Sequence, residues 1–263
     1  MRIVAIANQK GGVGKTTTSL NLSACLAARG LRVLLIDLDP QANTTSGLGI
    51  AQEEGGSLYP CLVSDVNPTQ VIRSTRLPNL SIIRSHQELA GCEVELAQTG
   101  HHLTRLRDVM KPLRYSGHFD YAIMDCPPSL GVLMTGALAA ADELLVPIQC
   151  EYFGLEGLSK IVQIVQQIRE SGANPALALE GIVMTMFDSR MNLSQQVVSD
   201  VRNYFSQVVY DTIIPRTIRL GEARALASRS SSTSRMVAVP RPTCPWPRSS
   251  CADTGILGRS VSG

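Results

Sequence analysis

Eight consecutive residues near the N-terminus carry the clearest chemical signal in this sequence: residues 10–17 read Lys-Gly-Gly-Val-Gly-Lys-Thr-Thr. The three glycines allow backbone conformations that a Cβ would obstruct, so their N–H groups can face phosphate oxygens at the start of the following helix. Lys15 supplies a positive charge for the β and γ phosphates, and the Thr16 hydroxyl is placed for magnesium. We therefore predict a site for a nucleoside triphosphate with Mg²⁺. Its predicted residues are Lys10, Gly11, Gly12, Val13, Gly14, Lys15, Thr16 and Thr17.

The first lysine of this segment sets it apart from the usual phosphate-loop pattern. The pattern G-x-x-x-x-G-K-[ST] fits only if Gln9 stands at the first glycine position. Because Lys10 lies well ahead of Lys15 in the loop, it can reach the phosphates only if the loop curls back or if it enters from another subunit. Two interpretations stay open from the residues alone: a solvated loop lysine, or a second phosphate-binding cation.

Acidic residues end two of the apolar runs. Asp37 and Asp39 close one run, and Asp125 ends another. Alternation along a strand predicts the carboxylates of Asp37 and Asp39 on one side of the chain, near the phosphates. An acid after an apolar strand is a common magnesium-side element of phosphate-loop enzymes. We predict Thr16, Asp39 and Asp125 around the metal, partly through water, with Asp39 activating or positioning the attacking water. The alternatives are a structural cap for Asp39 and a solvated strand end for Asp125.

Strand and helix patterns alternate along most of the chain. Predicted strands span residues 2–8, 32–37, 119–125, 144–149, 179–184 and 210–214, and predicted helices span residues 15–29, 93–111, 131–140, 155–169 and 193–205. Continuous apolar strands separated by helices predict an α/β fold, with a mostly parallel twisted sheet and helices on both faces. Ligands of such sheets bind at the carboxyl ends of the strands, which is where the glycine segment lies.

The composition changes sharply near the C-terminus. Residues 1–223 hold 18 Lys and Arg against 21 Asp and Glu, whereas residues 224–263 hold six Arg and one Asp. The same forty residues contain nine Ser and four Pro and have no sustained period, which predicts disorder. We therefore divide the chain into a domain over residues 1–223 and a tail over residues 224–263.

The sequence disfavours a membrane-spanning protein, a secreted protein and a protein built on disulfides or a cysteine metal site. No window holds the roughly 18 consecutive apolar residues that a membrane span needs, and the first apolar run is too short for a signal peptide. The seven cysteines include no C-x-x-C pair and lie mostly in apolar runs, which predicts buried thiols in a reducing compartment. We expect a cytoplasmic protein without a membrane partner.

Five segments resemble the bacterial chromosome-partitioning ATPase family ParA, in its small chromosomal form called Soj. They are residues 10–17, D-L-D-P-Q at 37–41, D-C-P-P-S-L-G at 125–131, Q-C-E-Y-F-G-L-E-G at 149–157 and D-S-R-M-N-L at 188–193. The resemblance covers about residues 1–223. It implies a phosphate-loop NTPase fold with a deviant Walker A segment, and ATP and Mg²⁺ as ligands.

The resemblance also implies roles for single residues. Lys10 would cross a dimer interface to the partner subunit's ATP, Lys15 would bind phosphate, and Asp39 would serve hydrolysis. The implied assembly is an ATP-dependent homodimer that binds DNA without sequence preference at the nucleoid, and whose hydrolysis is stimulated by a ParB-type partner protein. The implied cargo is the chromosome, with a plasmid as the alternative. The positions that match the family's base and DNA contacts are Met186, Pro215, Arg190, Arg216 and Arg219.

The resemblance ends after Ala223. The family continues there with a Pro-Ser segment, a strand and a closing helix, whereas this chain changes abruptly to Ser, Arg and Pro. The change looks like a frameshifted reading frame, and a genuine divergent tail is the alternative. We expect lower stability and weaker activity than in the family, and the nucleotide sequence around codon 223 distinguishes the two origins.

Three other functions stay open. A MinD-like division-site ATPase would share the loop but needs a C-terminal amphipathic helix, a pattern that residues 224–263 lack. An iron–sulfur reductase or carrier resembling the nitrogenase iron protein would need cysteines at a dimer junction, where Cys126 is the candidate. A non-enzymatic DNA-binding protein would use the arginines of the tail as a basic arm.

Overall fold

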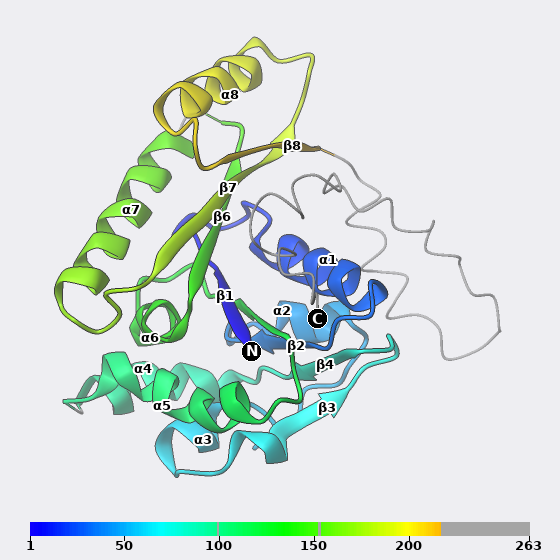
Figure 1. Cartoon of the computed structure of the whole chain (residues 1–263), viewed down its shortest axis with the longest axis vertical. Helices are drawn as coiled ribbons and strands as arrows, with labels where there is room; N and C mark the ends of the chain where they lie inside the picture. Colours follow the sequence, from blue (N-terminus) through cyan, green and yellow to red (C-terminus); the bar gives the residue numbers. More distant parts are fainter. Residues whose placement is uncertain (99, 152–153, 217–263) are drawn as a thin grey trace, which may run out of the picture.

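The computed structural model describes residues 1–98, 100–151 and 154–216 (Figure 1). Among these residues one eight-stranded sheet has the order β3-β4-β2-β5-β1-β6-β7-β8. Every neighbouring pair is parallel except β3 and β4. The predicted fold class, a mostly parallel α/β sheet, is confirmed. The strands are β1 (Arg2–Ile6), β2 (Val33–Asp37), β3 (Ile72–Ser74), β4 (Leu80–Ile83), β5 (Tyr121–Asp125), β6 (Glu143–Gln149), β7 (Ala178–Phe187) and β8 (Val209–Pro215).

Helices cover both faces of the sheet. In β1, Ile3 and Ala5 belong to the core shared with α5 to α8, whereas Val4 and Ile6 belong to the core shared with α1. This alternation follows from the period of two in a strand, which sends successive side chains to opposite faces. The helices are α1 (Lys15–Ala28), α2 (Asn43–Gly47), α3 (Tyr59–Val63), α4 (Cys92–Glu95), α5 (His102–Tyr115), α6 (Val132–Ala140), α7 (Gly154–Glu170) and α8 (Asn192–Tyr204), with short 3-10 helices η1 (Pro68–Val71), η2 (Gln87–Gly91) and η3 (Leu96–Gln98).

One local prediction was wrong, and two strands were missed. The helix predicted over residues 93–111 is broken into α4, η3 and α5, and Gly100 lies between the last two. Glycine inside a helix costs about 1 kcal/mol relative to alanine, which favours a break there. The strands β3 and β4 were not predicted, because they are only three and four residues long. The antiparallel edge strand β3 is mostly exposed, so it lacks the apolar run that marks the buried strands.

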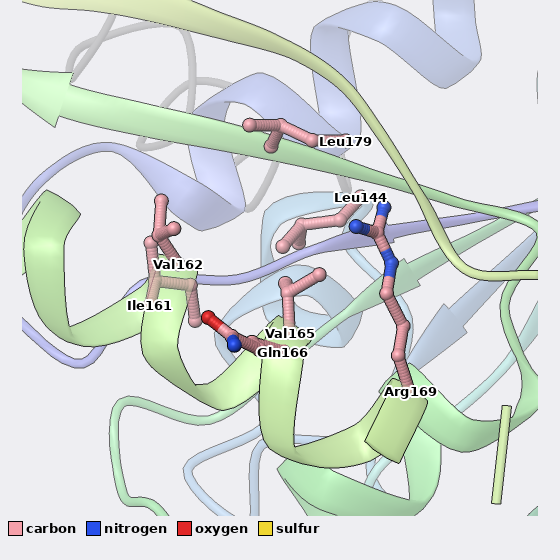
Figure 2. Close-up of a pocket in the computed structure, with 7 residues that line it drawn as sticks. All are labelled: Leu144, Ile161, Val162, Val165, Gln166, Arg169 and Leu179. Atoms are coloured by element: carbon pink, nitrogen blue, oxygen red, sulfur yellow. The ribbon is translucent and has the colours of Figure 1, made fainter. Parts of the chain in front are cut away.

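A cavity of about 170 Å³ lies between α7 and the strands β6 and β7 (Figure 2). Its apolar lining includes Leu144, Leu179, Ile161 and Val165, with Arg169 at the end of the helix. Among the described residues, none of those predicted to bind nucleotide, metal or DNA lines it. The cavity is therefore a feature of helix–sheet packing, separate from the carboxyl edge of the sheet.

Gly181 in β7 provides a test of packing between β7 and β8. A Cβ at this position would overlap the ring of Tyr210. That residue is 9% exposed, and its hydroxyl donates a hydrogen bond to Glu180, so the ring has little room to retreat. We expect Gly181→Ala to lower the free energy of unfolding by about 1–3 kcal/mol in urea titration. Gly100→Ala, where the added Cβ meets nothing within 4 Å, is the control and should stay within about 0.5 kcal/mol. Equal stability of the two variants would contradict the packing argument.

The Glu180 carboxyl predicts a pH dependence of stability. Burial, followed by the charge of Glu143, raises the pKa of Glu180 from 4.5 to about 7. Between these values the folded chain holds a proton that the unfolded chain has released, so the free energy of unfolding falls as pH rises toward 7 and then levels off. We expect Glu180→Gln to flatten this part of the profile of melting temperature against pH. The exposed Glu170→Gln serves as control, and an unchanged slope in Glu180→Gln would refute the assignment.

Candidate functional site

The glycine segment joins the carboxyl end of β1 to the first turn of α1 (Figure 1). Gly12 and Gly14 have φ angles of 76° and 90°, a backbone region that side chains with a Cβ rarely adopt. Gly14 is also the residue that caps α1. A Cβ added at Gly11 or Gly12 would meet nothing within 4 Å, so open space lies beside this part of the loop. Val13 is buried and accepts a hydrogen bond from Thr185 through its carbonyl at 2.8 Å.

Lys15 is a buried cation at the start of α1. The residue is 7% exposed, and its Nζ donates a hydrogen bond to the carbonyl of Lys10 at 3.1 Å. Burial lowers the pKa of Lys15, although the charges of Asp125 and Asp39 oppose this effect. A buried ammonium group held by one loop carbonyl is well suited to an anion placed inside the loop. The residues present therefore fit a phosphate group.

Asp125 gathers hydroxyl groups at the end of β5. Its Oδ2 accepts hydrogen bonds from Thr16 at 2.9 Å and Thr44 at 2.5 Å, and its Oδ1 accepts one from Ser19 at 3.0 Å. Burial raises the pKa of Asp125, while the three hydroxyl donors lower it. Hydroxyl and carboxylate oxygens are the ligands that Mg²⁺ prefers, usually with several waters retained. Thr16 and Asp125 would therefore suit Mg²⁺ beside a bound phosphate.

The two acids at the end of β2 differ in their surroundings. Asp37 is fully buried, and its Oδ2 accepts hydrogen bonds from the N–H and the hydroxyl of Thr45 at 2.8 and 2.7 Å. Burial and the charge of Asp125 raise the pKa of Asp37 to about 7. Asp39 is half-buried, and its Oδ1 accepts a hydrogen bond from the N–H of Gln41 at 3.0 Å. Asp37 is therefore enclosed and bonded to Thr45, whereas Asp39 is the more accessible to a ligand.

Lys10 makes two contacts with neighbouring polar side chains. Its N–H donates to Asn8 Oδ1 at 3.0 Å, and its Nζ lies 3.5 Å from Glu151 Oε2. The other oxygen of Glu151 accepts a hydrogen bond from Gln149 at 2.5 Å. In this arrangement the ammonium group of Lys10 contacts Glu151, while that of Lys15 lies on the loop itself. The two lysines therefore occupy different places and do not form one cluster.

The positions matched to base contacts lie at the ends of two neighbouring strands. Met186 is near the end of β7, one residue after Thr185, whose hydroxyl donates a hydrogen bond to the loop at the Val13 carbonyl. Its φ of 52° is left-handed, an uncommon conformation for a residue with a side chain. Pro215, at the end of β8, pairs with Phe187. The fold thus brings Met186 and Pro215 to the same edge as the loop, with no contact between either and Lys15 among those described.

The matched arginines lie on the same edge of the molecule. Arg190 is exposed and forms an ion pair with Asp188 at 2.7 Å. Arg216 is also exposed, and its N–H donates to the Phe187 carbonyl at 2.9 Å. The Arg190 hydrogen bonds, with a smaller effect from the charge of Arg216, hold the pKa of Asp188 at about 2. Arg190 and Arg216 are therefore close enough to act on one carboxylate. Arg219 lies outside the described residues, as does the predicted tail.

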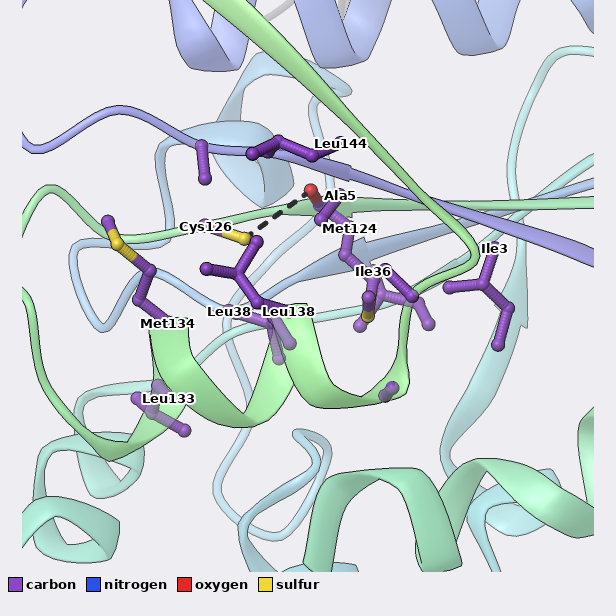
Figure 3. Close-up of a cluster of buried hydrophobic side chains, with 14 of the residues drawn as sticks. Ile3, Ala5, Ile36, Leu38, Met124, Cys126, Leu133, Met134, Leu138 and Leu144 are labelled. Atoms are coloured by element: carbon purple, nitrogen blue, oxygen red, sulfur yellow. Dashed lines mark hydrogen bonds between the residues drawn. The ribbon is translucent and has the colours of Figure 1, made fainter. Parts of the chain in front are cut away.

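The Cys126 side chain belongs to the core (Figure 3). Its Sγ lies 3.8 Å from the carbonyl oxygen of Met124, among apolar side chains that include Leu38 and Leu138. Burial raises the pKa of the thiol, which disfavours the thiolate form that binds metals. The other cysteines within the described ranges are also buried, and none of them forms a disulfide there: Cys25, Cys61, Cys92 and Cys150. The arrangement gives no support to an iron–sulfur role for Cys126.

Several residues of the site were missed by sequence reasoning. Ser19 follows Thr16 by three positions on α1, so helical spacing could have placed both hydroxyls on one face. Thr44 and Glu151 gave no such signal, because they reach Asp125 and Lys10 from distant segments. In the described part of the chain, no group of three or more His, Cys, Asp or Glu side chains could hold a metal, and no helix is long and apolar enough to cross a membrane.

The chain is similar to one protein family and to several bacterial partitioning proteins. Residues 1–179 match the family AAA_31, described as an AAA domain. The chain is 48% identical over 224 residues to the chromosome partitioning protein ParA of Caulobacter vibrioides, a match that covers 85% of this chain and 84% of that one. It is also 48% identical over 223 residues to the sporulation initiation inhibitor protein Soj of Bacillus subtilis, with 84% and 87% covered.

Solved structures show the same fold, one of them with ADP and magnesium bound. A cobyrinic acid a,c-diamide synthase from Mycobacterium smegmatis, with bound ADP and magnesium, superposes with a TM-score of 0.76 at 36% identity, covering 86% of this chain and 92% of that one. McdA from Cyanothece in its apo form gives a TM-score of 0.79 at 29% identity, with 86% and 90% covered. The phosphate-loop geometry and the close relatives agree, and the chain belongs to the ParA/Soj family of chromosome-partitioning ATPases.

Proposed function

We propose that this chain is a Mg²⁺-dependent ATPase that dimerises with ATP, binds DNA without sequence preference and acts with a ParB-type partner protein in chromosome partitioning. The observation that carries the proposal is the separation of the two loop lysines: Lys15 lies on its own loop, while Lys10 points to Glu151. A cation placed outside its own cradle is available for a second subunit. The proposed location is the cytoplasm, at the nucleoid.

Within one subunit, each proposed role follows from position. The N–H groups of the loop and the Nζ of Lys15 would bind the β and γ phosphates at the start of α1. Thr16 and Asp125 would hold Mg²⁺, which supplies electrostatic stabilisation of the transferring phosphate when bound. Asp39, whose charge acts on both Lys15 and Asp125, would orient the attacking water. Met186 and Pro215, at the same edge, would contact the base or ribose.

The proposed DNA surface consists of Arg190 and Arg216, with Arg219 as a further candidate beyond the described residues. An acidic body needs a local group of cations to approach DNA phosphates, and dimerisation would double that group. Arg190 is bound to Asp188 in this structure, so its contact with DNA would replace an exposed ion pair. Such a fully exposed pair contributes little to stability, which leaves the arginine available to a phosphate.

This proposal can be tested with the full chain and random-sequence duplex DNA. We expect ATP with Mg²⁺, but not ADP, to produce a dimer in sedimentation and to induce DNA binding. Replacing Arg190 and Arg216 by alanine should weaken DNA binding and reduce the slope of its salt dependence by about one unit for each phosphate that is no longer bound. The exposed Arg73→Ala, on the distant edge strand β3, is the matched control. DNA binding that is independent of nucleotide would contradict the proposal and favour a simple basic arm.

A further inference from the structure

The short helix α2 presents two consecutive buried threonines to two different carboxylates. The hydroxyl of Thr44 donates to Asp125 at 2.5 Å, whereas Thr45 donates to Asp37 through both its N–H and its hydroxyl. Both threonines are fully buried. Asp37 and Asp125 are themselves register partners at the ends of the adjacent strands β2 and β5. The helix is therefore bonded to the carboxyl ends of two strands at once.

The segment between Asp39 and this helix is short and restrained. The carbonyl of Asp39 accepts hydrogen bonds from Ser85 Oγ at 2.5 Å and from the N–H of Ala42 at 2.8 Å. Ala42 is fully buried and has φ 51° and ψ 38°, a left-handed conformation that costs an alanine about 1–2 kcal/mol. Strain of this kind persists where the surrounding structure enforces it, and it is common next to functional residues. Asp39 and α2 therefore form one restrained unit.

The Asp125 carboxylate is where this unit meets the phosphate loop. Its Oδ2 accepts hydrogen bonds from Thr16, which comes from the loop, and from Thr44, which comes from α2. Its Oδ1 is occupied by Ser19. A carboxylate oxygen shared by two hydroxyl donors makes the position of each donor depend on that of the other. The placement of α2 is in this way linked to the residues around the phosphates.

We propose that Thr44 is a positioning residue for ATP hydrolysis, which holds the Asp39 segment in register with the phosphate loop through its hydrogen bond to Asp125. The inference rests on the proposed function, because it takes Asp39 as the residue that orients water. It adds a residue that acts only through Asp125 and Asp39. The hydroxyl, and not the methyl group, carries the effect, because a buried hydrogen bond to a carboxylate is among the stronger ones in proteins.

Two variants separate the hydroxyl of Thr44 from its methyl group. Thr44→Val keeps the shape and removes the donor, whereas Thr44→Ser keeps the donor and removes the methyl group. In the full-length protein we expect Thr44→Val to lower kcat at least about tenfold, which corresponds to about 1.4 kcal/mol, with KM for ATP changed less than about twofold. Thr44→Ser should restore most of kcat. Thr135→Val, which removes a hydroxyl bonded to the carbonyl of Gly131 at the start of α6, is the control.

A second readout does not depend on activity. Amide hydrogen exchange of the nucleotide-free protein should be faster across residues 38–47 in Thr44→Val than in the wild-type chain, Thr44→Ser or Thr135→Val. If Thr44→Val does not fold, Ser85→Ala removes the other side-chain hydrogen bond to the same segment and should show the same pair of changes.

Each outcome decides the proposal. Faster exchange together with a lower kcat in Thr44→Val, and rescue by serine, supports it. Equal impairment of the valine and serine variants overturns it in favour of methyl packing, and a change in only one of the two readouts overturns the coupling between position and hydrolysis. A wild-type chain that does not hydrolyse ATP would overturn the proposed function as a whole. A wild-type chain that does, with Thr44→Val unaffected, overturns only the role of Thr44.

Discussion

Replacement of Lys10 by alanine is expected to abolish ATP-dependent dimerisation and to lower the hydrolysis rate by about 100-fold or more, while the monomer still binds ATP. The reason is geometric. The ammonium group of Lys15 donates to the carbonyl of Lys10 within its own loop, whereas the ammonium group of Lys10 contacts Glu151. Under the proposed function, removing Lys10 would leave the phosphate-binding loop of the same subunit in place and would remove a cation from the site of the partner subunit. Sedimentation with ATP and a phosphate-release assay measure the two effects.

Two further variants make this result specific. Lys15→Ala should lose ATP binding itself, because it removes the buried cation of the loop. Glu151→Gln should change the dissociation constant of the dimer by no more than about fivefold, since a partly exposed ion pair contributes about 0.2–1 kcal/mol. We expect the dissociation constant to fall, because the substitution frees Lys10 from its contact with Glu151. Normal hydrolysis in Lys10→Ala would show that Lys10 is a solvated loop lysine, the other interpretation that the sequence leaves open.

The main strands and the loop could be predicted because their signals are local. Runs of buried apolar residues encode β1, β2, β5 and β6, and the glycines with Lys15 encode a loop whose chemistry depends on backbone conformation. The short edge strand β3 could not be predicted in this way, because its residues are mostly exposed and its pairing depends on β4. Gly100 lies within residues 93–111 and disfavours one long helix there, because glycine destabilises a helix interior.

The partners of the acidic residues are a different case. Asp125 was predicted from its place after an apolar run, but Thr44 lies 81 residues away from it in the sequence and Ser19 lies 106 away. A threonine in a short polar segment resembles any turn residue until the fold brings it to a carboxylate. Likewise, alternation grouped Asp37 with Asp39, whereas burial separates them, with Asp37 enclosed by Thr45. Tertiary contacts, which leave no local pattern, decide which of two neighbouring acids can reach a ligand.

Because Asp39 is more accessible than Asp37, the second large effect is expected from replacing Asp39. We expect Asp39→Ala to bind ATP and form a dimer, and to lose about 10²–10⁴-fold in hydrolysis rate, because a residue that positions or activates water is removed. Asp39→Asn, with the same shape and no charge, should lose a similar factor. Stable dimers in both variants, measured by sedimentation over hours, would separate loss of chemistry from loss of folding. Hydrolysis at the wild-type rate in either variant would assign Asp39 to a capping role.

Mixing the Lys10→Ala and Asp39→Ala chains before ATP is added tests both assignments together. If Lys10 acts on the partner subunit's ATP, the mixed dimer contains one complete site: the Lys10→Ala subunit keeps its own Asp39 and receives Lys10 from the other chain. Because the Lys10→Ala chain is not expected to dimerise with itself, the amount of mixed dimer is measured by sedimentation. Each mixed dimer has one complete site of two and should hydrolyse ATP at about half of the wild-type rate per dimer. If Lys10 acts within its own subunit, every site lacks one of the two residues and the mixture stays inactive. Hydrolysis by the mixed dimers would mean that a second copy of the chain completes the site. Mixed dimers that do not hydrolyse ATP would assign Lys10 to the site of its own subunit.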